Sequence, residues 1–254
     1  MQLFEPSHYA AFDQPKPKLD DLATRFERTK VKEVFLELHS MIWPHISSMN
    51  WDLHRHRQVN HYVSSDHFVF LEDGTPIVNY IDGMWLHYGK SPSQLDFIKL
   101  IGGFDYKKRN DEDYFNAFYL HTRIQFYIND SIFRAWLLLA TDKNYYDRSE
   151  LLRRLSKDRA ERTQFFYLVK PLFNKDFFYE IDDRTLPLTS ALTEDAFIKF
   201  VRSDTPGIYS GIVKEYDPMN MQLEVSNIKT EMVENLNLLY PLYNFMSWRP
   251  KLKP

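Results

Sequence analysis

The chain has 254 residues, of which 44% are hydrophobic, and its formal net charge is −3. This composition supports a sizeable core and gives no overall attraction to polyanions, so nucleic-acid binding would need a local basic patch. The chain contains no cysteine. That absence excludes disulfides, thiolate zinc sites and cysteine nucleophiles, and it is typical of a reducing compartment.

Glycine occurs 7 times, and the sequence holds neither the dinucleotide-binding nor the Walker-type glycine loop. The N-terminus lacks the basic and then apolar build of a signal peptide. The longest apolar run, Ala135 to Ala140, is far shorter than the roughly 20 residues that a membrane span needs. We therefore expect a cytoplasmic protein with no cofactor and no membrane contact.

The first part of the chain is predicted to form two helices, a β-hairpin and a third helix. A short helix at Phe4 to Phe12 is followed by a long one that starts near Leu19 and stops at Trp43-Pro44. The apolar stripe of the long helix consists of Leu19, Leu22, Phe26, Val34, Leu38 and Ile42. The runs 68–70 and 77–88 are predicted strands, because the Asp-Gly pair between them is a strong hairpin signal. Ser91-Pro-Ser-Gln94 is typical of a capping box that opens a helix through residue 101.

The segment from Phe118 to Leu139 predicts the central hairpin of a sheet. Apolar and polar residues alternate from 118 to 128, the pattern of a half-buried antiparallel strand. Asn129-Asp-Ser131 supplies turn residues before a second apolar run. The side chains predicted to face solvent are Tyr119, His121, Arg123, Gln125 and Tyr127.

The remaining elements are read from capping boxes and from hydrophobic spacing. They are a capping box at 147–150 that opens a basic helix over 149–155, a strand pair at 165–169 and 177–181, a helix from Thr193 to Val201, a strand at 209–216, and a helix at 228–246 with a kink at Pro241. Consecutive hairpins without regular β-α-β alternation favour an α+β fold. We predict one domain over residues 1–254, with a mainly antiparallel sheet and long N-terminal and C-terminal helices packed on one face.

The stretch His54-Arg-His-Arg-Gln-Val-Asn60 resembles the basic His-x-x-Arg-x-Val-Asn stretch of the YktB-like family of uncharacterised bacterial proteins. The opening Phe4 to Phe12, the strand 123–126 with Ala135-Trp136, and the segment 239–243 are similar to family features in the same order. The sequence departs from the family at His61-Tyr62, and the segment 90–116 is extra. The resemblance implies an antiparallel sheet with helices on one side, in outline like the TATA-binding protein, and it implies no established activity.

Six of the nine histidines lie within one short stretch: His39, His45, His54, His56, His61 and His67. In an extended strand His54 and His56 would point to the same side, a spacing that can chelate a divalent metal if a carboxylate such as Asp52 or Asp66 joins them. The alternative is that these histidines are partly exposed or form hydrogen bonds with the backbone. A metal-dependent, nuclease-like hydrolase is therefore the second hypothesis for the function.

The first hypothesis is a module that binds an anionic partner, most directly nucleic acid, because forked donors and rings suit phosphates and bases. Its predicted binding residues are His54, His56, Arg57, Asn60, Tyr119, His121, Arg123 and Tyr127. Each surface has an ordinary alternative: Arg57 can pair with a carboxylate, and the strand face can be a plain solvent surface or can be covered by another helix. The basic run from Arg153 to Arg162 is a solvated helix face or a phosphate track. A structural subunit with a protein partner is the third hypothesis.

Overall fold

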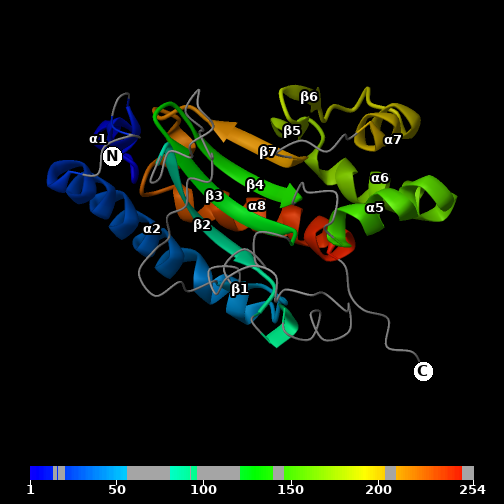
Figure 1. The fold of residues 1–254 in the computed structure, drawn as a ribbon, viewed down its shortest axis with the longest axis horizontal. Helices are drawn as coiled ribbons and strands as arrows, with labels where there is room; N and C mark the ends of the chain where they lie inside the picture. The colour runs from blue at the N-terminus through cyan, green and yellow to red at the C-terminus, as the bar shows by residue number, and fades with distance from the viewer. Residues whose placement is uncertain are drawn as a thin grey trace, which may run out of the picture.

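The computed structural model describes residues 1–13, 16, 21–55, 81–91, 93–95, 121–139, 146–203 and 210–247. The strands of this part of the chain form one antiparallel sheet in the order β1-β2-β3-β4-β7-β5-β6. Helices α2 and α8 share one core with a face of this sheet (Figure 1). The predicted α+β fold, with long helices from both ends of the chain on one face of an antiparallel sheet, is confirmed.

The helices are α1 (Pro6–Tyr9), α2 (Leu22–Ser48), α5 (Tyr146–Lys157), α6 (Arg159–Val169), α7 (Glu194–Arg202) and α8 (Ile228–Met246), with 3-10 turns η1 (Ala10–Phe12), η4 (Lys170–Leu172) and η5 (Met221–Leu223). The strands are β1 (His54–Arg55), β2 (Gly83–Gly89), β3 (Arg123–Asn129), β4 (Phe133–Leu139), β5 (Phe177–Ile181), β6 (Arg184–Pro187) and β7 (Ser210–Tyr216). None of the described helices combines the length and the apolar character that crossing a membrane requires.

The centre of the sheet is the hairpin of β3 and β4, which pair in antiparallel register. Asn129 shapes its turn, because the side-chain oxygen accepts hydrogen bonds from the backbone N–H groups of Ser131 and Ile132 at 3.0 and 2.9 Å. The predicted hairpin is confirmed. Its first strand begins at Arg123, and residues 118–120 of the predicted strand lie outside the described residues.

Helix α2 begins and ends later than the sequence predicts. The carboxylate of Asp21 accepts the N–H of Thr24 at 2.8 Å and so caps a helix that starts at Leu22. The helix continues through Pro44 to Ser48. Because Ile42 and Ile46 on either side of this proline are both buried, packing outweighs the backbone hydrogen bond that proline cannot donate.

The buried stripe of α2 also differs from the predicted one. Leu22 and Phe26 are exposed, at 85% and 61% of their surface, whereas Arg28 is buried. The Arg28 guanidinium donates hydrogen bonds to the carbonyl oxygens of Lys16 and Ile81 at 2.7 and 3.4 Å. The predicted stripe is therefore wrong at Leu22 and Phe26, because a polar residue within the buried stripe hides it from a search for apolar spacing. At Leu38 and Ile42, which are buried, the prediction is confirmed.

Residues 165–169, predicted as a strand, belong to helix α6. Asp158 is the N-cap of this helix, since its carboxylate accepts the N–H groups of Ala160 and Glu161 at 2.8 and 3.4 Å. The apolar residues Phe165, Phe166 and Val169 form the buried side of the helix. A short aromatic run reads the same in a helix and in a strand, which explains the error.

The later elements follow their predictions closely. The expected strands at 177–181 and 209–216 are β5 and β7, the helix capped by Thr193 is α7, and the last helix is α8 at its predicted bounds. Strand β2, at Gly83–Gly89, covers the second half of the expected strand 77–88 and extends one residue beyond it. The rest of that predicted hairpin, and most of the predicted insertion 90–116, lie outside the described residues.

The predicted capping box at Ser91 is confirmed by both of its hydrogen bonds. The N–H of Ser91 donates to the Gln94 side-chain oxygen at 2.6 Å, and the N–H of Gln94 donates to the Ser91 hydroxyl at 3.2 Å. The helical turn continues at Leu95, which is buried. Residues 96–101 of the predicted helix lie outside the described part of the chain.

A polar cluster fastens α8 to the sheet. One carboxylate oxygen of Glu231 accepts hydrogen bonds from the Lys214 ammonium and the Tyr216 hydroxyl of β7 at 2.7 and 2.6 Å. Asn235 donates to the same tyrosine oxygen at 2.5 Å. Burial, together with the charge of Glu231, raises the pKa of Tyr216 far above its ordinary value. The hydroxyl therefore stays protonated and holds helix and strand together.

Candidate functional site

The polar side of β3, predicted to face solvent, is largely buried. His121, Arg123 and Gln125 expose 3%, 6% and 3% of their surface, and Tyr127 is half-buried. The Arg123 side chain donates from Nε to the Gln125 oxygen at 3.0 Å. The prediction of a solvated face is therefore wrong at these three positions. Their part in binding an anionic partner stays a prediction.

A second hydrophobic cluster lies on this same face of the sheet. Trp136, Leu138 and Val213 pack together, with Phe178 against them, and Gln125 lies directly opposite Trp136 in the register of β3 and β4. Strand β4 is apolar at consecutive positions, a pattern typical of a strand buried on both sides. The apolar run of β4 could have predicted that the second face of the sheet is buried, whereas the alternation within β3 predicted that this face is exposed to solvent.

A buried ion pair joins the ends of two strands to the start of α5. Asp147 accepts a hydrogen bond from the Lys90 ammonium at 2.8 Å and one from the N–H of Thr122 at 2.7 Å, both at Oδ2. The Nδ1 atom of His121 lies 3.4 Å from the same oxygen. Lys90 directly follows β2, and Thr122 directly precedes β3. The carboxylate therefore ties these strand ends to the helix.

Burial raises the pKa of Asp147, but the charges and hydrogen bonds of Lys90 and His121 outweigh burial, so that this pKa lies well below its usual range. The carboxylate therefore stays ionised near neutral pH and serves to hold the structure. The sequence predicts Asp147 as the cap of a helix over 149–155. This prediction is wrong, because α5 already begins at Tyr146 and Asp147 lies within its first turn. The charged partner of Asp147 comes from a position 57 residues away, which a local pattern cannot reveal.

Two histidines of the predicted metal site have separate partners. His39 Nδ1 lies 2.8 Å from the Tyr88 hydroxyl, and His45 Nε2 lies 3.0 Å from the Asn237 side-chain oxygen. Burial, and to a smaller degree the charge of Arg55, lowers the pKa of His39 to about 4. His39 is therefore a neutral, half-buried ring at ordinary pH.

His54 lies beside Asp52, with Nε2 3.3 Å from Oδ1, while the Gln94 amide donates to Oδ2 at 2.5 Å. Within the described ranges, no three His, Cys, Asp or Glu side chains lie close enough together to hold a metal ion. The remaining predicted binding residues fall outside those ranges: His56, Arg57, Asn60 and Tyr119. The metal-dependent alternative, which needs His56 as well as His54, therefore stays a prediction.

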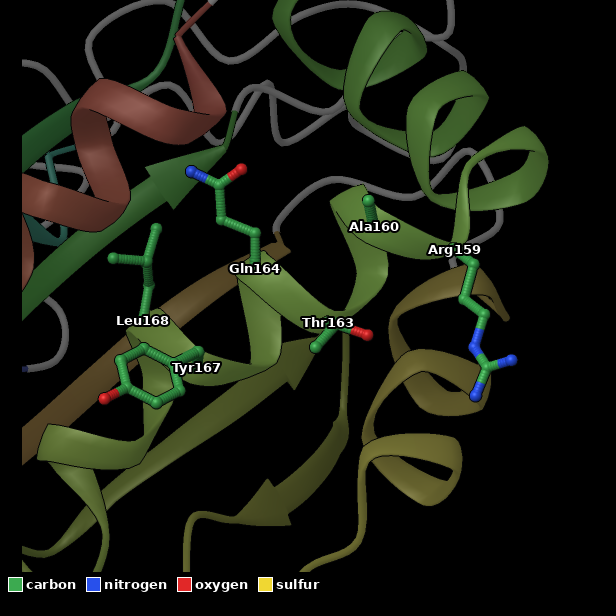
Figure 2. Close-up of a pocket in the computed structure, with 6 residues that line it drawn as sticks. All are labelled: Arg159, Ala160, Thr163, Gln164, Tyr167 and Leu168. Carbon is green, nitrogen blue, oxygen red and sulfur yellow. The ribbon is translucent and has the colours of Figure 1, made fainter.

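An open hollow of about 770 Å³ runs along the outer side of α6 (Figure 2). Two rows of residues line it, at helical spacing along the face opposite the buried phenylalanines. We call this surface the α6 stripe: Arg159, Ala160, Thr163, Gln164, Tyr167 and Leu168, continued by Lys170 at the end of the helix. Tyr167 exposes 70% of its surface at the centre of the stripe.

Some charged side chains of α5 and α6 form ion pairs, and others do not. Arg153 donates to Glu150 at 2.6 Å and Arg154 to Glu161 at 2.9 Å, and Asp158 caps the helix. In the described part of the chain, Arg159 and Lys170 form no ion pair. The basic run predicted from sequence is therefore split between two helices. Among the described residues of this run, Lys157 and Arg162 also form no ion pair. The α6 stripe has Arg159 at one end and Lys170, which lies outside the run, at the other.

The basic run predicted from the sequence includes Arg159 of this surface, but it includes neither Lys170 nor Tyr167. The sequence predicts a strand over 165–169, and in a strand Tyr167 would not share a face with Lys170. Helical spacing would have shown Arg159, Thr163, Tyr167 and Lys170 as one row.

A comparison with protein-family models gives no match to this chain, and a comparison with curated proteins gives none either. The resemblance to the YktB-like family therefore stays a prediction.

Proposed function

We propose that the protein binds a polyanion, nucleic acid in the first place, through the α6 stripe. The observation that carries the proposal is one row of side chains along a hollow, with a cation at each end and an exposed ring between them. Arginine forks and lysine ammonium groups bind phosphates, and aromatic rings bind bases. The proposed partner, nucleic acid, is the one expected from the sequence, but the proposed binding surface is the α6 stripe in place of the binding residues predicted from the sequence.

The electrostatics of the two helices support an anionic ligand. An ordinary solvated helix face neutralises its charges by pairs spaced three or four residues apart. Here Glu161 is taken by Arg154, and Asp158 is taken by the backbone N–H groups that it caps. The cations of the stripe thus keep their charge for a ligand. Glu194 of α7, which accepts a hydrogen bond from Thr163 at 3.2 Å, limits the positive field on that side.

The test is fluorescence anisotropy with labelled single-stranded DNA, duplex DNA and heparin over a range of salt concentrations. We expect binding that weakens steeply with salt, because phosphate contacts release counterions. The variant R159Q/K170Q removes the two end cations. It should weaken binding to single strands by roughly 10-fold at about 50 mM salt and reduce the log–log salt slope by about 1.4, since each phosphate contact on a single strand contributes about 0.7.

The matched control is K30Q/K229Q, which removes the same charge from exposed positions on α2 and α8. We expect it to bind like the unaltered protein, with the same salt slope. Circular dichroism should show that both variants keep the unaltered fold. The proposal is wrong if the protein binds none of the three polyanions, or if the two variants lose affinity equally.

A further inference from the structure

We infer that the ligand is single-stranded nucleic acid and that one of its bases stacks on the ring of Tyr167. This inference rests on the proposed function and narrows it to one class of polymer. Its starting point is the position of the ring. Tyr167 exposes 70% of its surface, although the neighbouring Phe165 and Phe166 are buried in the core.

The tyrosine ring already has a cation beside it. The Lys170 ammonium lies 5.6 Å from the centre of the Tyr167 ring and 5.5 Å from that of Phe166. The lysine is therefore drawn toward the two rings, within the range of a cation–π contact. A base that stacks on Tyr167 would bring its own phosphate close to this ammonium group. Ring and charge would thus act on the same nucleotide.

The rest of the hollow suits the parts of a nucleotide. Gln164 supplies an amide that can hydrogen-bond to a base edge, and Ala160 and Leu168 supply apolar contact. The Thr163 hydroxyl donates its proton to Glu194, so its oxygen can still accept a hydrogen bond from a base. At about 1.5 Å per residue, Arg159 lies about 12 Å along the helix axis from Tyr167. The arginine can therefore reach the phosphate of a neighbouring nucleotide rather than the stacked one.

Single strands fit this surface better than duplexes do. In a duplex the faces of the bases are covered by their neighbours, so a ring on a protein surface can reach a base only after it is unstacked. A single strand offers bare base faces without that cost, and stacking on an aromatic side chain tolerates any sequence. The inferred site therefore predicts a preference for single strands with little dependence on sequence.

The molecule offers a matched control on α2. Phe26 is an exposed ring, at 61% of its surface, and the Lys30 ammonium lies 4.8 Å from its centre. This pair has the same ring and charge chemistry as Tyr167 and Lys170. The hollow described along α6 is not lined by either residue. Removing this ring should leave nucleic-acid binding unchanged.

The experiment compares Y167L, Y167F and F26L by anisotropy with an oligothymidylate of about 12 nucleotides, within the length that such sites cover, and with an abasic oligonucleotide of equal length. Unaltered protein and Y167F should bind the abasic strand on the order of 10-fold more weakly than oligothymidylate. Y167L should bind oligothymidylate on the order of 10-fold more weakly, and should no longer distinguish the two strands. F26L should behave like the unaltered protein.

The inference is overturned if the unaltered protein binds both strands equally, if it prefers duplex DNA, or if Y167L binds as tightly as Y167F. In each of these cases a weakened R159Q/K170Q variant would leave the polyanion proposal standing. If the protein binds none of the polyanions, both the polyanion proposal and the single-strand inference are wrong. Since Tyr167 is exposed, thermal unfolding of Y167L should match that of the unaltered protein, so that a lost affinity reports on the ligand.

Discussion

Lys90 and Asp147 form an ion pair across 57 positions of the sequence, with the ammonium nitrogen 2.8 Å from Oδ2. The two side chains expose only 5% and 0% of their surface. Removing one partner of such a buried pair is far more costly than replacing both, because a lone charge is left in a poorly solvated place. The pair therefore predicts a specific pattern of stabilities.

We expect D147N to lower the free energy of unfolding by about 3 kcal/mol, because it takes away the carboxylate that balances the buried lysine. The double variant K90M/D147L should recover part of this loss, since neither charge remains, although the N–H of Thr122 loses its acceptor. Urea unfolding followed by circular dichroism at neutral pH measures both values. Equal stability of D147N and the unaltered protein would show that the pair holds nothing together.

Acid should act on the same pair. The pKa of Asp147 is lowered in the folded protein, so its contribution to stability is complete above the unfolded value of about 3.9 and is lost as the pH falls below it. The free energy of unfolding should therefore decline more steeply below about pH 4 in the unaltered protein than in K90M/D147L. Parallel acid profiles for the two proteins would contradict this account.

His39 should give a second pH dependence, at higher pH. Burial lowers the pKa of this ring to about 4, so protonation favours the unfolded chain and stability falls as the pH drops from about 6.5 to about 4. Solvent reaches part of the ring, so we expect a loss of about 1 to 2 kcal/mol over that range. In H39Q the fall over the same range should be smaller by this amount, and the remainder includes His8, whose pKa burial also lowers. An NMR titration of the His39 ring gives its pKa directly.

Gly211 should not tolerate a side chain. A Cβ at this position would collide with the carbonyl oxygen of Leu137 on the neighbouring strand and would lie 2.9 Å from the Trp136 indole nitrogen. We expect G211A to lower the free energy of unfolding by about 2 kcal/mol, because the backbone must move. T185A, at an exposed position of β6, is the matched control and should be nearly neutral. Urea unfolding of both variants tests this difference.

The sequence predicted those elements whose signals are local. The turn residue Asn129, the cap at Thr193 and the spacing of Met232 and Leu236 each lie within the element that they define. Such patterns fixed the central hairpin, α7 and α8 because neighbouring residues suffice to form them. They also predicted that one face of the sheet is covered by the long helices.

The errors arise where residues far away in the sequence determine whether a side chain is buried and what it contacts. Arg123 and Gln125 look like surface residues until Trp136, Leu138 and Val213 are known to share their face. Asp147 resembles a helix cap until Lys90 is known to be beside it. The candidate site was predicted only in part: Arg159 belongs to the predicted basic run, whereas Lys170 lies outside that run and Tyr167 was assigned to a strand. Tertiary context overrides local pattern in each of these cases.

Among the described strands, β7 lies between β4 and β5 in the sheet although it follows β6 in the chain. The β3–β4 and β5–β6 hairpins can each form soon after synthesis, but they share no edge until residues 210–216 have left the ribosome. A nascent chain that stops before this point would carry two separate half-sheets with open edges, which are prone to aggregate. Premature termination shortly before residue 210 should therefore yield insoluble fragments.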